Sequence, residues 1–264
     1  MSGNGVLKRS RERHERSLPT APFAVAPHVY VCVTGDGSVI LDLKRDKYLG
    51  LGKRDTELLA ATIGSWPKPR WDRTETEPTS DAAVADTAEL CRSLAADGLL
   101  IYGVGNDAHA TGVPPVNMKR EWVSMGDEID VESKVTVRHV ANFVVAFLWA
   151  RCSLAWRPFY ATVEVMRVDK ARCGGGIDPN QMVKITALVG VFRQLRPLVF
   201  AAEGRCLLHA LTLTRFLNRY GFYPEWVIGV ATQPWAAHAW VQCGNFLLDT
   251  NPEKVCRYTP ILVI

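Results

Sequence analysis

The stretch that decides the fold of the C-terminal half is AAHAWVQCGNFLLD, residues 236–249. Gly244-Asn245 is a pair typical of a two-residue β-hairpin loop, with glycine suited to the first position of a type II′ turn. In that register Cys243 faces Phe246, and Val241 faces Leu248. The sequence therefore predicts a hairpin centred on Gly244-Asn245.

A histidine and an aspartate lie on the two arms of this hairpin. Because side chains alternate between the faces of a strand, His238, Trp240, Asp249 and Asn251 should share one face. The register pairs Trp240 with Asp249 and His238 with Asn251, so His238 and Asp249 are diagonal neighbours within hydrogen-bond reach. An imidazole oriented by a carboxylate can act as a general base.

Cys206 is the candidate nucleophile for this base. It begins a predicted helix, Cys206–Tyr220, and follows Arg205. A helix N-terminus and a neighbouring cation both lower the pKa of a thiol and favour the thiolate. A cysteine at a helix start, followed by His and Asp on adjacent strands, has the order of a transglutaminase-like Cys-His-Asp triad.

Two other interpretations use the same residues. Cys206-x2-His209 and His238-x4-Cys243 superficially resemble a zinc spacing. His238 and Cys243 should point to opposite faces of one strand, however, so we expect no metal site. His209 lies one turn after Cys206 and is an alternative base, but the sequence offers it no evident orienting carboxylate.

The N-terminal part has a different pattern. Short strands joined by tight turns predict a β-meander, and helical spacing follows at 58–63 and 81–97. Residues 23–103 should form one small unit, residues 104–129 a linker rich in Gly, Pro and Asn, and residues 130–264 a second unit. In the second unit, helices are expected over 135–148, 161–168 and 185–195. The three predicted strands of the meander are Val29–Val33, Ser38–Leu43 and Lys47–Gly52.

Composition limits the class of protein. The 264 residues are 48% apolar and 22% charged with a net charge of +4, which is typical of a globular protein. Basic residues cluster in the first sixteen positions, and no apolar segment follows them, so residues 1–22 should be a disordered basic tail and not a signal peptide. The longest apolar run, Phe143 to Ala150, is shorter than the roughly 20 residues of a membrane span. The seven cysteines are odd in number and include no CxxC, so in a reducing compartment buried or reactive thiols are favoured over a disulfide framework. We expect a cytoplasmic protein with no nucleic-acid partner and no membrane span.

The segment Gly204-Arg205-Cys206-Leu207, the strand Val227–Val230 and the run AHAWV at 237–241 resemble the lasso peptide biosynthesis B proteins. These are transglutaminase-like (papain-like) cysteine peptidases that remove the leader from a ribosomally made precursor. The resemblance covers residues 130–264 and implies that Cys206 is the nucleophile, His238 the base and Asp249 its orienter. Where the family often continues the run with Glu, this chain has Gln242.

The resemblance also implies partners. Family members work with an asparagine-synthetase-like cyclase, which closes the macrolactam of the antibiotic peptide, and leader removal can depend on ATP. The chain itself has no GxxxxGK[ST] nucleotide loop and no other evident cofactor motif.

The front unit is similar to the PqqD-like recognition element, a small winged-helix-like domain. The matching phrases are Leu41–Leu43, Tyr48–Leu51 and Asp97–Leu100. This resemblance implies that the leader adds as a strand to the edge of the meander. The residues implied to contact the leader are Lys47, Tyr48, Leu49 and Leu51 of the third strand and Leu90 and Leu94 of the last helix.

The expectation is thus an α+β protein in which residues 23–103 bind the leader and residues 130–264 hydrolyse the leader–core bond. Two alternatives stay open: an acyl transferase that uses the same triad, and a non-catalytic chaperone for the precursor.

Overall fold

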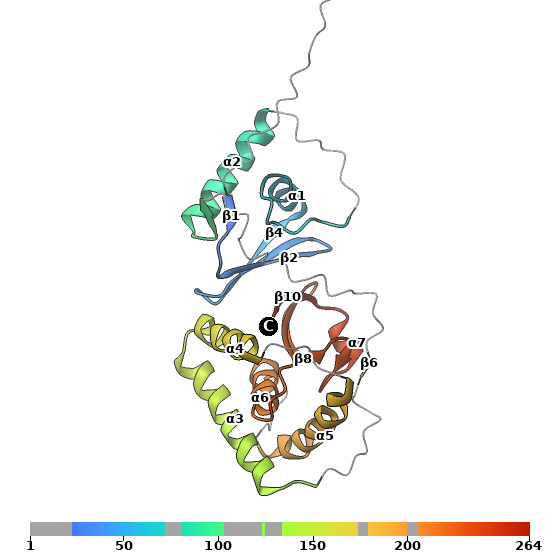
Figure 1. The fold of residues 1–264 in the computed structure, drawn as a ribbon. Coiled ribbons are helices and arrows are strands. Elements are labelled where there is room, and N and C mark those ends of the chain that lie inside the picture. Colours follow the sequence, from blue (N-terminus) through green and yellow to red (C-terminus); the bar gives the residue numbers. More distant parts are fainter. Residues whose placement is uncertain (1–22, 72–80, 103–122, 125–133, 174–178, 200–204) are drawn as a thin grey trace, which may run out of the picture.

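The computed structural model describes residues 23–71, 81–102, 123–124, 134–173, 179–199 and 205–264. The described elements form two units, which lie one above the other in Figure 1. The predicted basic tail, residues 1–22, and most of the predicted linker lie outside the described residues.

The N-terminal unit is built on the predicted meander. Its three strands are antiparallel in the order β2-β3-β4, with Ser38 opposite Leu51. Helix α2 ends just before Gly98, whose φ of 72° suits glycine at a helix C-terminus. Sequence patterns had not predicted the pair β1–β5, which brings Phe23 opposite Tyr102. The elements are β1 (Phe23–Val25), β2 (Val29–Thr34), β3 (Gly37–Asp42), β4 (Lys47–Gly52), α1 (Lys53–Thr62), α2 (Asp81–Ala96) and β5 (Leu100–Tyr102).

The three-stranded sheet is buried on both faces. Val31 and Ile40 pack with Leu59 of α1 in the core of the N-terminal unit. Their neighbours Cys32 and Leu41 point the other way and belong to the core of the C-terminal unit. Strand alternation therefore explains why every residue of β3 is buried. The face of the sheet that carries Cys32 and Leu41 therefore shares one apolar core with the C-terminal unit.

The C-terminal unit packs helices against a five-stranded sheet of order β10-β7-β8-β9-β6. The helices predicted over 135–148, 161–168 and 185–195 are present and longer than predicted, whereas the helix predicted over Cys206–Tyr220 ends at Asn218. Strand β10 and helix α7 had not been predicted. The elements are β6 (Val123–Ser124), α3 (Val137–Trp156), α4 (Phe159–Cys173), α5 (Pro179–Leu195), the 3-10 helix η1 (Arg196–Leu198), α6 (Cys206–Asn218), β7 (Glu225–Thr232), β8 (Trp235–Cys243), β9 (Phe246–Leu247), α7 (Pro252–Val255) and β10 (Thr259–Val263).

The predicted hairpin turn is confirmed at its tip. Cys243 lies opposite Phe246, and the backbone N–H of Leu248 donates to the carbonyl of Val241 at 3.0 Å. Gly244 has a φ of 61°, as the first central position of a type II′ turn requires.

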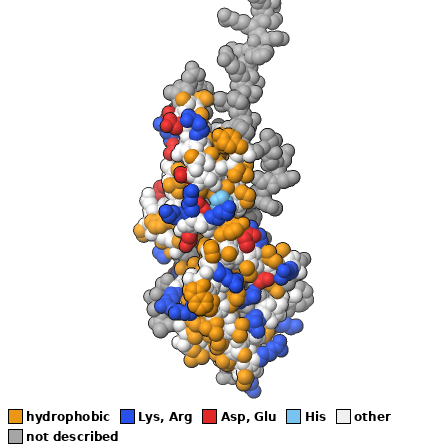
Figure 2. Space-filling model, turned by 90° about the vertical axis from the view of Figure 1, so that its left-hand side faces the viewer, with side chains coloured by type: hydrophobic (Ala, Val, Ile, Leu, Met, Phe, Trp, Pro, Cys, Tyr) orange, Lys and Arg blue, Asp and Glu red, His pale blue; other side chains and the backbone are white. Residues whose placement is uncertain are grey.

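Among the described residues, α3 is the one helix long and apolar enough to span a membrane by length and composition. Phe143, Ala146 and Ala150 on one side of it are buried in the core. Its other side exposes apolar residues such as Val144 and Leu148. Figure 2 shows this face of the molecule, where apolar side chains gather in the lower half among Lys and Arg.

The two units also touch through polar contacts. The Tyr30 hydroxyl accepts a hydrogen bond from Arg167 of α4. The Thr232 hydroxyl, at the end of β7, donates to the Asp36 carboxylate at 2.9 Å. Strand β10 lies beside β2 at the same junction (Figure 1). These contacts fix the meander against the sheet that carries His238.

Candidate active site

Cys206 is the first residue of α6, and its side chain is half-buried. Arg205, the N-cap, supplies no side-chain hydrogen bond to the first turn. Arg205 therefore does not occupy the N–H groups of that turn, and Cys206 lies at the positive end of the helix dipole. The backbone N–H at this position can supply one donor to an oxyanion.

Other thiols have different surroundings. Cys32 and Cys243 are buried, and burial raises the pKa of each to about 12. Both should stay protonated and unreactive across the neutral range.

Thiol labelling should separate these cysteines. Brief treatment with iodoacetamide at pH 7.5, followed by peptide mass spectrometry, should modify Cys206 and leave Cys32 and Cys243 unmodified until the protein is denatured. Cys256, which is exposed, serves as the control for simple accessibility. Alkylation of Cys32 or Cys243 at the rate of Cys256 would contradict this assignment.

Asp249 lies just beyond the hairpin, and only 6% of its side chain is exposed. Its Oδ1 accepts a hydrogen bond from Nε of Arg193 at 2.9 Å, and its Oδ2 lies 2.8 Å from Nε2 of His209. Burial alone would raise the pKa of this carboxyl, but His209 and Arg193 lower it further than burial raises it. The expectation that His209 has no orienting carboxylate is therefore wrong, because Asp249 supplies one from 40 residues away along the chain.

The predicted pairing of His238 with Asp249 does not form in this structure. Strand β9 ends at Leu247, so the ladder stops before Asp249 can lie opposite Trp240. The physical reason is the start of α7, where Asn251 accepts a hydrogen bond from the N–H of Glu253 and a proline follows at the first helical position. This helix start turns the chain out of the sheet.

His238 lies on β8 opposite Gly229. Its ring stacks on Tyr258 at 5.2 Å and on Trp240 at 6.2 Å. Burial lowers its pKa, and the nearby charges of Lys254 and Arg257 lower it further. The imidazole is therefore neutral at neutral pH. Its Nε2 is buried and makes no hydrogen bond within the described part of the chain.

Gly229 makes room for this aromatic stack. A Cβ at position 229 would lie 2.7 Å from the Trp240 ring. Any side chain there would displace Trp240 and, through it, His238.

The position of His238 relative to Cys206 is set by the sheet. Helix α6 packs on the face that carries Ala239 and Val241, while His238 shares the other face with Trp240. Because β9 is only two residues long, most of β8 has a neighbour on one side only, and His238 lies on this open edge. No hydrogen bond joins Cys206 to His238 among the residues the structure describes.

Gln242 takes the place of the glutamate expected from the resemblance. It is 2% exposed, accepts a hydrogen bond from the Trp240 indole at 2.7 Å, and donates to Glu225 at 2.7 Å. Its role in this structure is to fix the Trp240 ring, against which His238 stacks.

The zinc interpretation gains no support from the geometry. Cys243 lies in the core on the opposite face of β8 from His238. In the part of the chain that the structure describes, no group of three or more His, Cys, Asp or Glu residues is arranged to hold a metal ion.

The residues predicted to bind the leader lie on and beside β4. This strand is an edge of the three-stranded sheet. Lys47 and Leu49 are exposed, while Tyr48 and Leu51 are half-buried. On α2, Leu90 is half-buried and Leu94 is only 3% exposed. Leu94 is therefore part of the core of the N-terminal unit, and Leu90 is the member of this pair that a peptide could reach.

Comparison with known proteins gives one match. Residues 144–263 match the family model of the transglutaminase-like superfamily. These residues form a transglutaminase-like domain. The domain runs from α3 to β10 and includes Cys206, His209, His238 and Asp249. Searches of curated proteins and of solved structures gave no match.

The superfamily includes cysteine peptidases and transglutaminases, both of which form a thioester on a cysteine. The position of Cys206 at a helix start within the transglutaminase-like domain is consistent with cysteine-dependent peptidase or acyl-transfer chemistry.

Arg193 should stabilise the transglutaminase-like domain, because it donates a hydrogen bond to the buried carboxylate of Asp249. Its side chain is 24% exposed and donates both to Asp249 and to the carbonyl of Leu248. Arg193→Met should lower the free energy of unfolding by about 3 kcal/mol, because it leaves a buried carboxylate with fewer partners. The measurement is urea denaturation at pH 7.

Arg196 is the matched control for Arg193, since it faces the same carboxylate at 3.5 Å but is 49% exposed. Arg196→Met should cost less than about 1 kcal/mol. Equal destabilisation by the two substitutions would show that Arg193 does not anchor Asp249.

Proposed function

We propose that this protein is the leader peptidase of a lasso peptide pathway, which binds the leader of a ribosomally made precursor and hydrolyses the leader–core bond. The observation that supports it best is Cys206, half-exposed at the start of α6 within a transglutaminase-like domain, with His209 on the same helix and the buried carboxylate of Asp249 2.8 Å from His209.

Cys206 is the proposed nucleophile. Its thiolate attacks the scissile carbonyl, and the oxyanion is stabilised by the backbone N–H of Cys206 at the helix start. The protonated base then donates a proton to the leaving amine of the core peptide. Water releases the leader from the thioester and regenerates the thiol.

His238 is the proposed base. A general base must be neutral and must offer a nitrogen that no other group occupies. The lowered pKa of His238 and the unpartnered Nε2 meet both conditions. With His238 as the base, the role of Asp249 is to hold His209 and Arg193 in place.

His209 is the second candidate for this role, because the structure pairs Asp249 with His209. It lies three residues after Cys206 on α6, so the two side chains share one helix face. If His209 is the base, the Asp249 carboxylate faces Nε2 of His209 and orients the imidazole ring, as the carboxylate of a triad does.

The leader is proposed to bind at β4, where a peptide can add as a fourth strand to the meander. Lys47 and Leu49 are exposed along this edge. The sheet is fixed against the transglutaminase-like domain, so a bound leader is tethered to the domain that carries Cys206. Such tethering raises the local concentration of the scissile bond.

The remaining partners are proposed from the resemblance. The freed core amine would pass to an asparagine-synthetase-like cyclase in the cytoplasm, and any dependence on ATP would enter with that cyclase.

Two other functions would use parts of the same structure. Acyl transfer is favoured by the superfamily, which includes transglutaminases. A non-catalytic chaperone would use only the edge of β4.

One experiment separates the three functions. The precursor encoded beside the gene is incubated with the protein, with and without the cyclase and ATP, and the products are identified by mass spectrometry. A free leader carboxylate indicates hydrolysis. An added amine retained on the leader indicates acyl transfer. An intact precursor that still binds the protein, as measured by fluorescence anisotropy, would overturn both enzymatic functions.

A further inference from the structure

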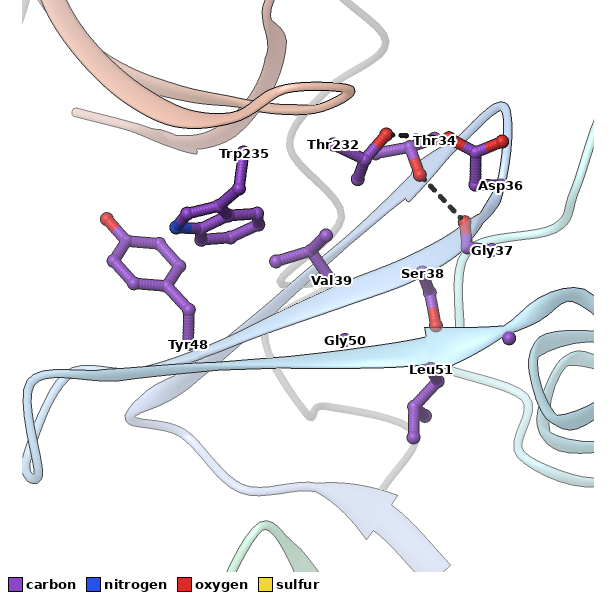
Figure 3. Close-up of a pocket in the computed structure, with 11 residues that line it drawn as sticks. Thr34, Asp36, Gly37, Ser38, Val39, Tyr48, Gly50, Leu51, Thr232 and Trp235 are labelled. Carbon is purple, nitrogen blue, oxygen red and sulfur yellow. Dashed lines mark hydrogen bonds between the residues drawn. The ribbon is translucent and has the colours of Figure 1, made fainter.

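A cleft of about 390 Å³ lies between the two units. One wall is the face of β3–β4 that carries Tyr48 and Gly50, and the other is the tip of the β7–β8 hairpin with Thr232 and Trp235 (Figure 3). Each unit therefore supplies one side of the cleft, which neither unit would form alone.

The two ends of the cleft differ in chemistry. Tyr48 and Trp235 form an aromatic end, with ring centroids 5.5 Å apart in an edge-to-face arrangement. Trp235 is 52% exposed, which is unusual for so large an apolar side chain inside a cleft. The opposite end carries hydroxyl and carboxylate groups from Thr34, Asp36 and Thr232, as Figure 3 shows.

Gly50 keeps the middle of the cleft open. A Cβ built at this position would meet no atom within 4 Å. The backbone there is not in the left-handed region, so the conformation does not require glycine. Strand alternation puts position 50 on the same face as Tyr48, so a side chain at Gly50 would project into the cleft.

The aromatic end lies on the side of the sheet that faces α6, the helix that carries the proposed nucleophile. Tyr48 packs against the apolar cluster that includes Leu208, two residues after Cys206 on α6. Trp235 shares a face of β8 with Ala239, which packs on the same core as α6. The cleft therefore lies on the same face of the sheet as α6.

We propose that this cleft is a substrate subsite that holds a large aliphatic or aromatic side chain of the peptide near the bond attacked by Cys206. The side chain lies over Gly50 against the Tyr48 and Trp235 rings, and the polar end receives the more hydrophilic part of the same peptide segment. This inference rests on the proposed peptidase function, which it deepens by naming the class of side chain that the enzyme selects.

Gly50→Leu tests the subsite by filling it. It should lower kcat/KM for the precursor by about 10-fold or more, mainly through KM. The rate of Cys206 alkylation by iodoacetamide should not change, because that small reagent does not need the cleft. Gly64→Leu is the matched control, since a Cβ at Gly64 also meets no atom within 4 Å and Gly64 lies outside the cleft. It should cleave like the wild type.

A second variant keeps the test valid if Gly50→Leu does not fold. Trp235→Ala removes one aromatic wall and should also lower kcat/KM by about 10-fold. An alanine scan of the precursor should reveal one large apolar residue whose loss harms the wild type but has little further effect in Trp235→Ala, as expected for two groups in contact.

The outcomes distinguish failure of the proposed subsite from failure of the proposed peptidase function. If the wild type, Gly50→Leu and Trp235→Ala cleave the precursor equally well, the subsite is wrong and the peptidase stands. If the wild type leaves the precursor intact under every condition, the proposed function falls and the subsite with it.

Discussion

Cys206→Ala is expected to abolish cleavage of the precursor, lowering kcat/KM by about 10,000-fold or more. Every covalent step of the proposed reaction passes through this sulfur, and none of the other cysteines begins a helix in the part of the chain that the structure describes. Cys32 and Cys243 are buried with raised pKa values, so neither can substitute for it. The measurement is the initial rate of leader release by mass spectrometry.

Precursor binding should survive this substitution. The leader is proposed to bind at β4, and Cys206 lies on a different element, so fluorescence anisotropy should give a similar Kd for wild type and Cys206→Ala. Cys256→Ala is the control for removal of an accessible cysteine and should retain full activity. Cleavage that persists in Cys206→Ala would refute thiol catalysis by this domain.

His238→Ala is expected to have the second largest effect, a decrease of about 1,000-fold in kcat/KM, in the range measured for loss of a general base. His209→Gln keeps a hydrogen-bond donor for Asp249 and should retain most of the activity. If the effects are reversed, with His209→Gln inactive and His238→Ala active, then His209 is the base that Asp249 orients.

The pH profile gives an independent test of the same assignment. The pKa of His238 is lowered from 6.5, so the base is neutral at pH 7 and becomes protonated only in more acidic solution. The wild-type kcat/KM should therefore stay level through neutral pH and fall only in solutions more acidic than the ordinary histidine pKa of 6.5. The residual activity of His238→Ala should lack this acidic limb.

The local parts of the site could be predicted from the sequence. Gly244-Asn245 specifies its turn through backbone conformation alone, so the pairing of Cys243 with Phe246 followed directly. Cys206 could be placed at a helix start because apolar spacing and Gly221 bounded that helix. Both features depend on residues within one turn or one hairpin.

The partner of Asp249 could not be predicted in this way. Its oxygens are held by His209 and Arg193, and Arg193 is 56 residues distant. A contact of that range depends on how α5 packs against the sheet, which no local spacing encodes. The early end of β9 was missed for a related reason, because extending the hairpin register gave no weight to the cap and proline at Asn251-Pro252.

The shared core also determines how the protein can be divided. Tyr30, Cys32, Val39 and Leu41 of the meander fill the same core as the helices of the transglutaminase-like domain. A truncation that removed either unit would leave a wide apolar patch in water, a surface prone to association. The two units should therefore unfold in a single cooperative thermal transition, although each unit also has an apolar cluster of its own. Expressed as two chains, they would be expected to recover a stable fold by binding each other across this sheet.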